Sequence, residues 1–194
     1  MNELIRLENV CFAYDGHIAL RYINLEILKG ETLVLQGANG CGKSTLLKLL
    51  NGLIYPEEGT YTFAGDEISE KTMKDSLFSK KFHQRVGFVF QNHDVQHFCG
   101  SVKEEIEFGP RQMGLSEEEI RRRAEDVIRL LDIENLAERA PYHLSGGEKK
   151  KVSLACVLSM NPEVLVLDEP LAGLDGATQD WLTDFLQELQ NAGK

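Results

Sequence analysis

Residues 37–44 have the composition and spacing of a phosphate-binding loop. The segment begins with glycine, continues with four residues and ends with Gly-Lys-Ser, and it stands between an apolar run and a helical pattern. This is the arrangement of a P-loop. Glycines without a Cβ let backbone N–H groups face an anion, and the following helix adds its N-terminal donors and the positive end of its dipole. Lys43 is expected to reach the β- and γ-phosphates of a nucleotide, and Ser44 is expected to ligate Mg²⁺. The predicted phosphate-binding residues are Gly37, Ala38, Asn39, Gly40, Cys41, Gly42, Lys43, Ser44 and Thr45.

Two carboxylates, Asp168 and Glu169, follow the apolar run at residues 164–167. A buried strand that ends in two acids is the pattern of a second nucleotide motif. In that motif the first acid holds Mg²⁺ through its water shell, and the second polarises the water that attacks the γ-phosphate. Two acids at a strand end can also be a solvated terminus. The phosphate-binding loop in the same chain favours the catalytic interpretation.

These residues need an α/β framework, and the pattern of apolar residues predicts one. The apolar run at 32–35 predicts a buried strand before the loop, and residues 45–50 predict the helix after it. Apolar residues alternate along 5–14 and 23–27, which predicts two antiparallel strands joined by a short turn at 15–16.

The middle of the chain continues this framework with shorter elements. Residues 61–66 predict a short strand, and residues 71–85 predict an exposed excursion with no assigned chemistry. Residues 86–90 predict a buried strand that leads directly into Gln91.

From Gln91 onward the pattern becomes helical. Ser116 and Glu119 stand at capping-box spacing before an apolar stripe of helical period. A helical lobe is therefore predicted between Gln91 and the glycine-rich turn Leu144, Ser145, Gly146, Gly147 and Glu148.

That turn opens a further helix, predicted over residues 149–160. Ser145 and Glu148 also stand at capping-box spacing, so both can simply start this helix. A last helix with Trp181 on its apolar face follows the loop at Leu174 and Asp175.

Length and composition restrict the class of protein. The 194 residues suffice for one α/β domain with an inserted lobe, and a net charge of −10 argues against non-specific nucleic-acid binding. Four cysteines without paired spacing are typical of reduced thiols in a cytosolic protein. No segment approaches the about 20 apolar residues that span a bilayer, and no signal peptide is recognisable. A cytoplasmic protein is expected, which reaches a membrane only by docking on other subunits.

Tyr14 stands at a strand end, before the turn that precedes the phosphate loop. It is either an ordinary strand-end aromatic or a platform on which an adenine ring stacks. The residues themselves favour neither interpretation.

Taken together, the motifs resemble those of ATP-binding cassette (ABC) ATPases over essentially the whole chain. Residues 144–148 match the family's signature motif, except that Glu148 replaces the usual glutamine. Gln91 matches the Q-loop, 168–170 the Walker B region and Asp175 the D-loop. Tyr14 matches the adenine-stacking A-loop, so the resemblance favours its nucleotide-binding role.

The resemblance implies a P-loop NTPase (RecA-like) α/β core, an N-terminal antiparallel β subdomain and an inserted α-helical subdomain. The implied boundaries are 1–90 and 145–194 for the core with the β subdomain, and 91–144 for the helical part, within a single ABC ATPase domain at 1–194. The family has a switch histidine after one more strand, and the chain ends before it. A truncated C-terminal end, and poor hydrolysis by the chain as it stands, are therefore expected.

Within the family, the chain looks similar to the energy-coupling-factor and cobalt or nickel importer ATPases at 86–92, Asp94, Gln96, 108–110 and 114–115. His93 stands where proline is usual. The resemblance implies an ATPase motor subunit of a membrane importer for cobalt, nickel or a vitamin, bound peripherally on the cytoplasmic side of the cell membrane.

The implied mechanism uses ATP, Mg²⁺ and two subunits. Lys43, Gln91 and Glu169 would be catalytic, and Ser44, Gln91 and Asp168 would hold Mg²⁺. The signature turn of one subunit would complete the γ-phosphate site of a second, identical or homologous, ATPase subunit. Integral membrane transport subunits are the other expected partners, and Gln91 would pass closure of the dimer to them. No nucleic-acid partner is expected.

Two alternatives remain. A soluble ABC protein of DNA maintenance or translation is disfavoured by the acidic charge, and a hydrolysis-impaired ATP-binding subunit is supported by the C-terminal end alone. His93, His97 and Cys99 are metal-ligand types within seven residues. The favoured interpretation is that they contact a partner, because such transporters bind the ion in their membrane subunits.

Overall fold

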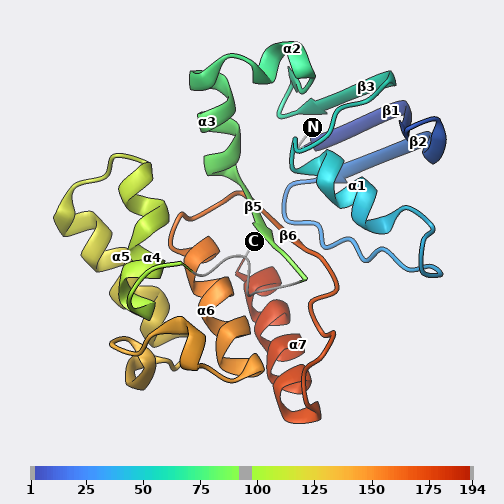
Figure 1. Cartoon of the computed structure of the whole chain (residues 1–194). Helices are drawn as coiled ribbons and strands as arrows, with labels where there is room; N and C mark the ends of the chain where they lie inside the picture. Colours follow the sequence, from blue (N-terminus) through green and yellow to red (C-terminus); the bar gives the residue numbers. More distant parts are fainter. Residues whose placement is uncertain (1–2, 92–97, 193–194) are drawn as a thin grey trace. The chain divides into compact units, whose positions relative to one another are not determined.

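The structure is a computed structural model that describes residues 3–91 and 98–192 (Figure 1). The chain forms two compact units. The first comprises the chain up to His83 and the segment from Leu186 onward, and the second runs from Gln84 to Phe185.

The first unit is built on a four-stranded sheet in the order β2-β1-β3-β4. Strands β1 (Glu3–Tyr14) and β2 (His17–Leu28) pair antiparallel, as predicted, with Tyr14 opposite His17 across the turn. Strand β3 (Glu58–Phe63) pairs with β1, and the short β4 (Asp66–Glu67) completes the edge.

Helix α1 (Lys43–Leu50) packs its apolar side into this unit. Leu46, Leu49 and Leu50 are buried, which accounts for a large part of the helix's stability because packing outweighs propensity in so short a helix. The buried Tyr61 hydroxyl of β3 donates a 2.8 Å hydrogen bond to the Leu50 carbonyl oxygen. This bond ties the end of α1 to the sheet.

The predicted exposed excursion at 71–85 is helical instead. Helices α2 (Glu70–Met73) and α3 (Ser76–Arg85) occupy it, and Phe82 is only 3% exposed. Phe82 packs edge-on against Phe63 with ring centroids 5.4 Å apart. The many charged residues of the segment predict exposure. The partner of Phe82 lies in β3, outside the segment, so the local sequence does not indicate the burial.

The second unit contains a parallel pair of strands and a set of helices. Strands β5 (Val86–Val89) and β6 (Val164–Leu167) pair in the register Val89 opposite Leu167. Helix α6 (Gly146–Leu158) packs against β5, and it approaches Gly87 so closely that a Cβ there would lie 2.4 Å from a Val157 methyl carbon.

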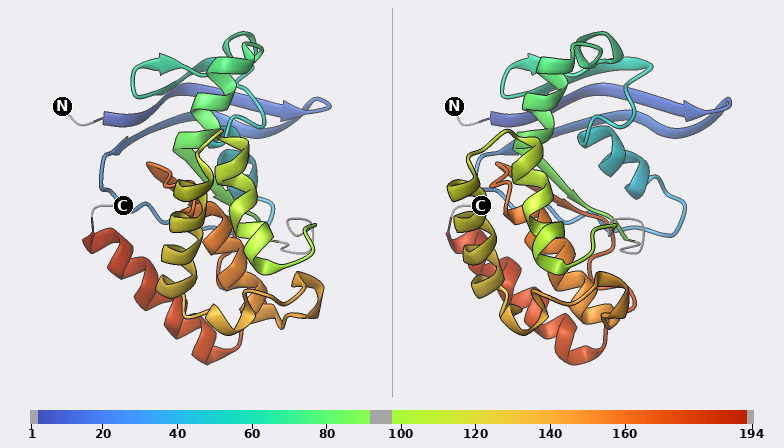
Figure 2. Two further views of the ribbon diagram at one scale, coloured as in Figure 1. Left: turned by 90° about the vertical axis from the view of Figure 1, so that its left-hand side faces the viewer. Right: turned by 60° about the vertical axis from the view of Figure 1, so that its left-hand side comes forward.

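The helices in the described part of this unit include α4 (Val102–Gln112), α5 (Glu117–Leu130), α6 (Gly146–Leu158) and the first part of α7 (Gly176–Asn191), with short 3-10 turns at Glu134–Leu136 and Pro141–His143. Figure 2 shows α4, α5 and α6 side by side. A helical region between β5 and α6 was predicted, and it is present. None of the helices in the described ranges has both the length and the hydropathy that a bilayer crossing requires.

The buried strand predicted at 32–35 is wrong. Residues 31–38 have no regular secondary structure, and Val34 is 70% exposed. A strand forms only where a neighbour satisfies its backbone N–H and C=O groups, and neither described sheet pairs with this segment. The apolar composition was therefore misleading.

Candidate functional site

The phosphate loop meets α1 at Gly42, which is the N-cap residue of the helix. Its backbone is left-handed, with φ 98°, and a Cβ there would lie 2.6 Å from the Ala19 carbonyl oxygen of β2. Only glycine fits this position without strain. The N-cap residue makes no side-chain hydrogen bond to the helix, and a helix start is the end whose backbone donors and positive dipole favour an anion.

The Lys43 side chain folds back into the loop. Its ammonium donates hydrogen bonds to the carbonyl oxygens of Gly37 at 2.8 Å and Ala38 at 3.0 Å, and it lies 4.0 Å from the Cys41 sulfur. A positive charge is therefore held at the centre of the loop, beside an uncapped helix start. This set of donors fits a di- or triphosphate.

A second cluster forms where β5 and β6 end side by side. The parallel register brings Gln91, after β5, next to Glu169, after β6, and the Gln91 side-chain amide donates a 2.7 Å hydrogen bond to the Glu169 carboxylate. The backbone N–H of the buried Asp168 donates to the Val89 carbonyl oxygen at 3.1 Å, which extends the pairing by one residue.

Glu169 adopts an unusual backbone conformation. Its φ is 43°, in the left-handed region that residues with a Cβ rarely occupy. Such conformations persist only where the surrounding structure imposes them, and they cluster at functional sites. The exposed carboxylate, held by an amide donor, can accept a proton from water.

The turn at Ser145 is a complete capping box, as the sequence predicts. The Glu148 backbone N–H donates to the Ser145 hydroxyl oxygen at 3.4 Å, and the Glu148 carboxylate accepts from both the N–H and the hydroxyl of Ser145 at 2.7 Å. At Ser116 only half of the box forms, because the Glu119 carboxylate pairs with Arg122 and Arg123 instead.

Asp175 lies immediately before α7 and acts as a helix cap. Its carboxylate accepts from the Thr178 N–H at 3.0 Å and from the Thr178 hydroxyl at 2.8 Å, and these hydrogen bonds lower the pKa of Asp175. Thr178 also lies next to the signature turn, since a Cβ on Gly147 would lie 3.1 Å from its hydroxyl oxygen. Thr178 was not singled out from the sequence. The three-residue Asp-to-Thr spacing is the capping signal that would have found it.

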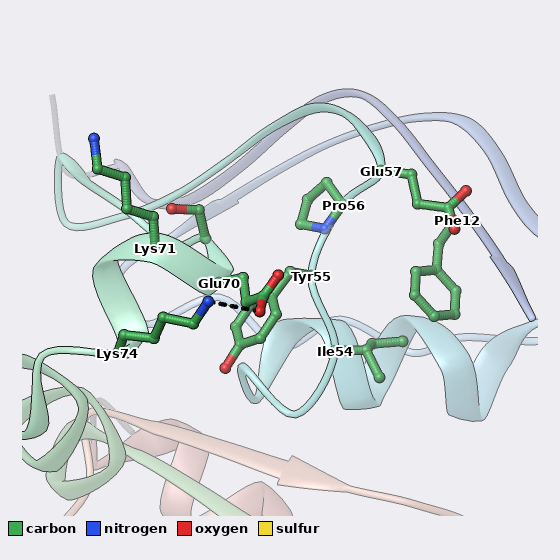
Figure 3. A pocket seen from close by; sticks show the side chains of 9 residues that line it. Phe12, Ile54, Tyr55, Pro56, Glu57, Glu70, Lys71 and Lys74 are labelled. Carbon is green, nitrogen blue, oxygen red and sulfur yellow. Dashed lines mark ion pairs between the residues drawn. The ribbon is translucent and has the colours of Figure 1, made fainter.

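Tyr14 is 42% exposed, and its ring packs edge-on against Phe12 with centroids 4.8 Å apart. Phe12 also lines a hollow of about 690 Å³ in the first unit (Figure 3). The other lining residues are Ile54, Tyr55, Pro56, Glu57, Ser69, Glu70, Lys71 and Lys74. None of the predicted phosphate-binding residues lines this hollow, so it is separate from the loop.

A family model described as "ABC transporter" matches residues 20–172. The chain belongs to this family. ABC transporter ATP-binding subunits are ATPases, so this chain is an ATPase that binds ATP. The expected family is thereby confirmed.

Similar proteins extend this result. The nickel import ATP-binding protein LarO of Lactiplantibacillus plantarum is 49% identical over 98% of this chain and 79% of its own length. The energy-coupling factor transporter ATP-binding protein EcfA2 of Methanospirillum hungatei is 43% identical over 100% of this chain and 48% of its own length.

The structure of cbiO1 from Clostridium perfringens, described as part of the ABC transporter complex cbiONQ, matches with a TM-score of 0.87. It is 37% identical and covers 100% of this chain and 76% of that one. This similarity confirms the predicted ABC cassette fold with its antiparallel β subdomain.

Of the three metal-ligand candidates His93, His97 and Cys99, the structure describes only Cys99. His93 and His97 lie outside the described residues, as do Asp94 and Gln96. Burial raises the pKa of the described Cys99 thiol to about 11, with Glu105 adding to the effect. Among the described residues, no group of three or more His, Cys, Asp or Glu side chains is arranged to hold a metal ion.

Alkylation of Cys41 is expected to inhibit ATP hydrolysis. Its thiol is exposed and lies 4.0 Å from the Lys43 ammonium, so an adduct would occupy the phosphate loop. The other three cysteines are half-buried, and burial raises the pKa values of Cys99 and Cys156, which lowers their reactive thiolate fraction.

Turnover measured before and after N-ethylmaleimide treatment checks this prediction. ATP is expected to protect, and the Cys41→Ser variant is expected to resist the reagent. Unchanged turnover after complete labelling of Cys41 would refute it.

The capping box at Ser145 should make folding stability depend on pH. Hydrogen bonds from the Ser145 hydroxyl and N–H lower the pKa of Glu148 below its usual 4.5. A carboxyl group with a lowered folded-state pKa stabilises the fold above its unfolded pKa, and this stabilisation is lost as pH falls through the folded value. The Glu148→Gln variant keeps an acceptor oxygen but does not titrate.

Denaturant unfolding of both proteins between neutral pH and the acid range below 4.5 measures this contribution. We expect the free energy of unfolding to fall less on acidification in Glu148→Gln, by no more than about 1 kcal/mol because the residue is only half-buried and solvent screens the carboxylate. Identical pH dependence in the two proteins would contradict the assignment.

Proposed function

We propose that the chain is the ATP-hydrolysing motor subunit of an energy-coupling-factor-type importer that takes up cobalt, nickel or a vitamin. The observation that carries this proposal is the 49% identity to a nickel import ATP-binding protein over 98% of the chain. The identity to an energy-coupling factor subunit and the fold shared with cbiO1 support it. In this role the subunit is peripheral on the cytoplasmic face of the membrane.

ATP is proposed to bind through its phosphates at residues 37–45, with Lys43 as the cation that meets them. The structural support is the uncapped, left-handed start of α1 and the ammonium held among the loop carbonyls. The base is proposed to stack on Tyr14, whose ring is partly exposed.

Ser44, Gln91 and Asp168 are proposed to hold Mg²⁺, because each side chain offers an oxygen atom and Mg²⁺ prefers oxygen ligands and keeps several waters. When bound, Mg²⁺ neutralises negative charge on the phosphates. Ser44 would contribute its hydroxyl, Gln91 its amide oxygen and Asp168 its carboxylate through water.

Glu169 is proposed to be the general base that takes a proton from the attacking water. The hydrogen bond from Gln91 fixes the carboxylate without neutralising it, because an amide donates but does not titrate. An ionised, oriented carboxylate is what a general base requires. The backbone conformation of Glu169 adds to this orientation.

Two cassettes are proposed to act head to tail. The turn of Leu144, Ser145, Gly146, Gly147 and Glu148 opens α6 with its N-terminal donors and dipole, and it is proposed to complete the γ-phosphate site of the second subunit. A lone subunit would then bind ATP without the full set of transition-state contacts. Closure of the pair and hydrolysis are thereby coupled.

The division into a nucleotide-binding part, 1–90 with 145–194, and a helical part, 91–144, remains our proposal. The helical part is the proposed docking region for integral membrane subunits, with Gln91 at its start. Asp175 is proposed to contribute to the contact between cassettes.

Purification of the tagged chain from membranes tests the importer role. Recovery of small integral membrane proteins in fixed proportion to the chain is the expected result. ATP hydrolysis that is stimulated by DNA or ribosomes, with no membrane protein recovered, would support a soluble ABC protein instead. The net charge of −10 makes that second result unexpected.

A further inference from the structure

Helix α6, which begins at the signature turn, carries a lysine that makes two long-range contacts. The Lys151 ammonium donates a 3.1 Å hydrogen bond to the carbonyl oxygen of Leu131, the C-cap residue of α5. It also lies 4.6 Å from the centroid of the Trp181 ring on α7. The Lys151 side chain therefore connects α6 with the end of α5 and with α7.

The contact with α5 is reciprocal. Arg123 of α5 donates to the carbonyl oxygens of Ser159 at 3.4 Å and Met160 at 3.3 Å, at the C-terminal end of α6. The last carbonyls of a helix have no partner within it and carry the negative end of its dipole. Each helix thus supplies a cation to the C-terminus of the other, which holds α5 and α6 antiparallel (Figure 2).

The contact with α7 also has two points. Gly147 and Lys151 are four residues apart on α6, so they share a face, and their neighbours on α7 are Thr178 and Trp181, which are three residues apart. Trp181 is fixed in turn by stacking on Phe185, with centroids 5.5 Å apart. The first turns of α6 therefore lie against the start of α7, which Asp175 caps.

We infer that Lys151 is a positioning residue for ATP hydrolysis, which fixes the signature turn relative to the D-loop helix α7 and to α5. Residues 144–147 start the helix that carries Lys151 one turn later, so a change in the direction of α6 moves the signature turn. This inference rests on the proposed function, because it concerns the turn that completes the partner cassette's site.

The expected kinetic signature follows from where the contacts lie. Within the described part of the chain, the hydrogen bond of Lys151 goes to Leu131 and its ring contact to Trp181, and neither partner belongs to the phosphate loop or to the Gln91–Glu169 pair. ATP binding by the subunit's own loop should persist without it. Turnover should fall, because the signature turn acts in the transition state and small displacements of such a group are costly.

The test compares Lys151→Met with Lys151→Arg in the purified protein. Methionine keeps an apolar stem but loses the charge and the donors, and arginine keeps both and binds aromatic faces. Arg122→Met is the matched control, because it removes a cation from the adjacent helix, its side chain is 67% exposed and its described hydrogen bonds go to Glu119.

Two readouts are measured. Lys151→Met is expected to lower kcat about tenfold with little change in KM for ATP, while Lys151→Arg and Arg122→Met stay close to the unsubstituted protein. Trp181 is the chain's single tryptophan, so its fluorescence reports the contact. Its emission is expected to change in Lys151→Met and to be retained in Lys151→Arg and Arg122→Met.

Several results would overturn the inference. Unchanged kcat in folded Lys151→Met would do so, as would an equal loss in Lys151→Arg. If Lys151→Met does not fold, Lys151→Gln, which keeps a donor but no charge, should show a smaller loss of kcat in the same direction, and unchanged kcat there would also overturn it. No turnover in the unsubstituted protein would instead contradict the proposed function, and this role with it.

Discussion

Replacing Glu169 with glutamine should nearly abolish ATP hydrolysis while ATP still binds. The substitution is isosteric, and an amide oxygen can still accept the hydrogen bond that Gln91 donates to the carboxylate at 2.7 Å. The amide cannot accept a proton from water at neutral pH. Because a positioned general base contributes about 10²–10⁴-fold to a rate, steady-state turnover should fall by at least about a hundredfold.

Phosphate release and nucleotide binding, measured on the same protein sample, check this result. Glu163→Gln is the matched control, since Glu163 lies just before the start of β6 and pairs with Arg85 at 2.6 Å. That ion pair is partly exposed, and its loss should change turnover little. Substantial steady-state hydrolysis by Glu169→Gln would remove Glu169 from the role of base.

Replacing Lys43 with methionine should weaken ATP binding. The ammonium holds the positive charge at the centre of the phosphate loop, and methionine has a stem of similar length without charge or donors. Hydrogen bonds to charged groups contribute about 1.5–3 kcal/mol, so the dissociation constant should rise about tenfold to a hundredfold.

Equilibrium binding of a fluorescent ATP analogue measures the effect of the Lys43 substitution. Lys48→Met serves as its control, because Lys48 is an exposed cation in the last turn of the same helix. Its removal should leave affinity unchanged. Equal affinities in all three proteins would show that the phosphates bind elsewhere.

The features that the sequence predicts well are those set by local rules. The phosphate loop depends on glycine positions and a following helix, and the left-handed Gly42 at the start of α1 agrees with that expectation. The capping box at Ser145 depends on two residues three apart, and both of its hydrogen-bond directions are present. The strands at 3–14 and 17–28 follow from alternation and a short turn.

The features that the sequence could not predict depend on distant partners. Residues 32–35 have the composition of a strand, but pairing decides whether a strand forms, and composition does not show the partner. Phe82 is hidden in a charged segment because its ring contacts lie in β3. Lys151 stands in a run of three lysines, and such a run is typical of a solvated helix face. Its ammonium instead donates a hydrogen bond to the Leu131 carbonyl oxygen and lies against the Trp181 ring.

The claim that the site is shared between two subunits is tested most directly by mixing two defective proteins. Lys43→Met damages the phosphate loop but keeps the signature turn, and Ser145→Arg damages the turn but keeps the loop. In a head-to-tail pair of one of each, one site has both intact halves. We predict that the mixture hydrolyses ATP well above the sum of the two proteins measured separately. Activity equal to that sum, in a mixture shown to form mixed pairs, would contradict the account.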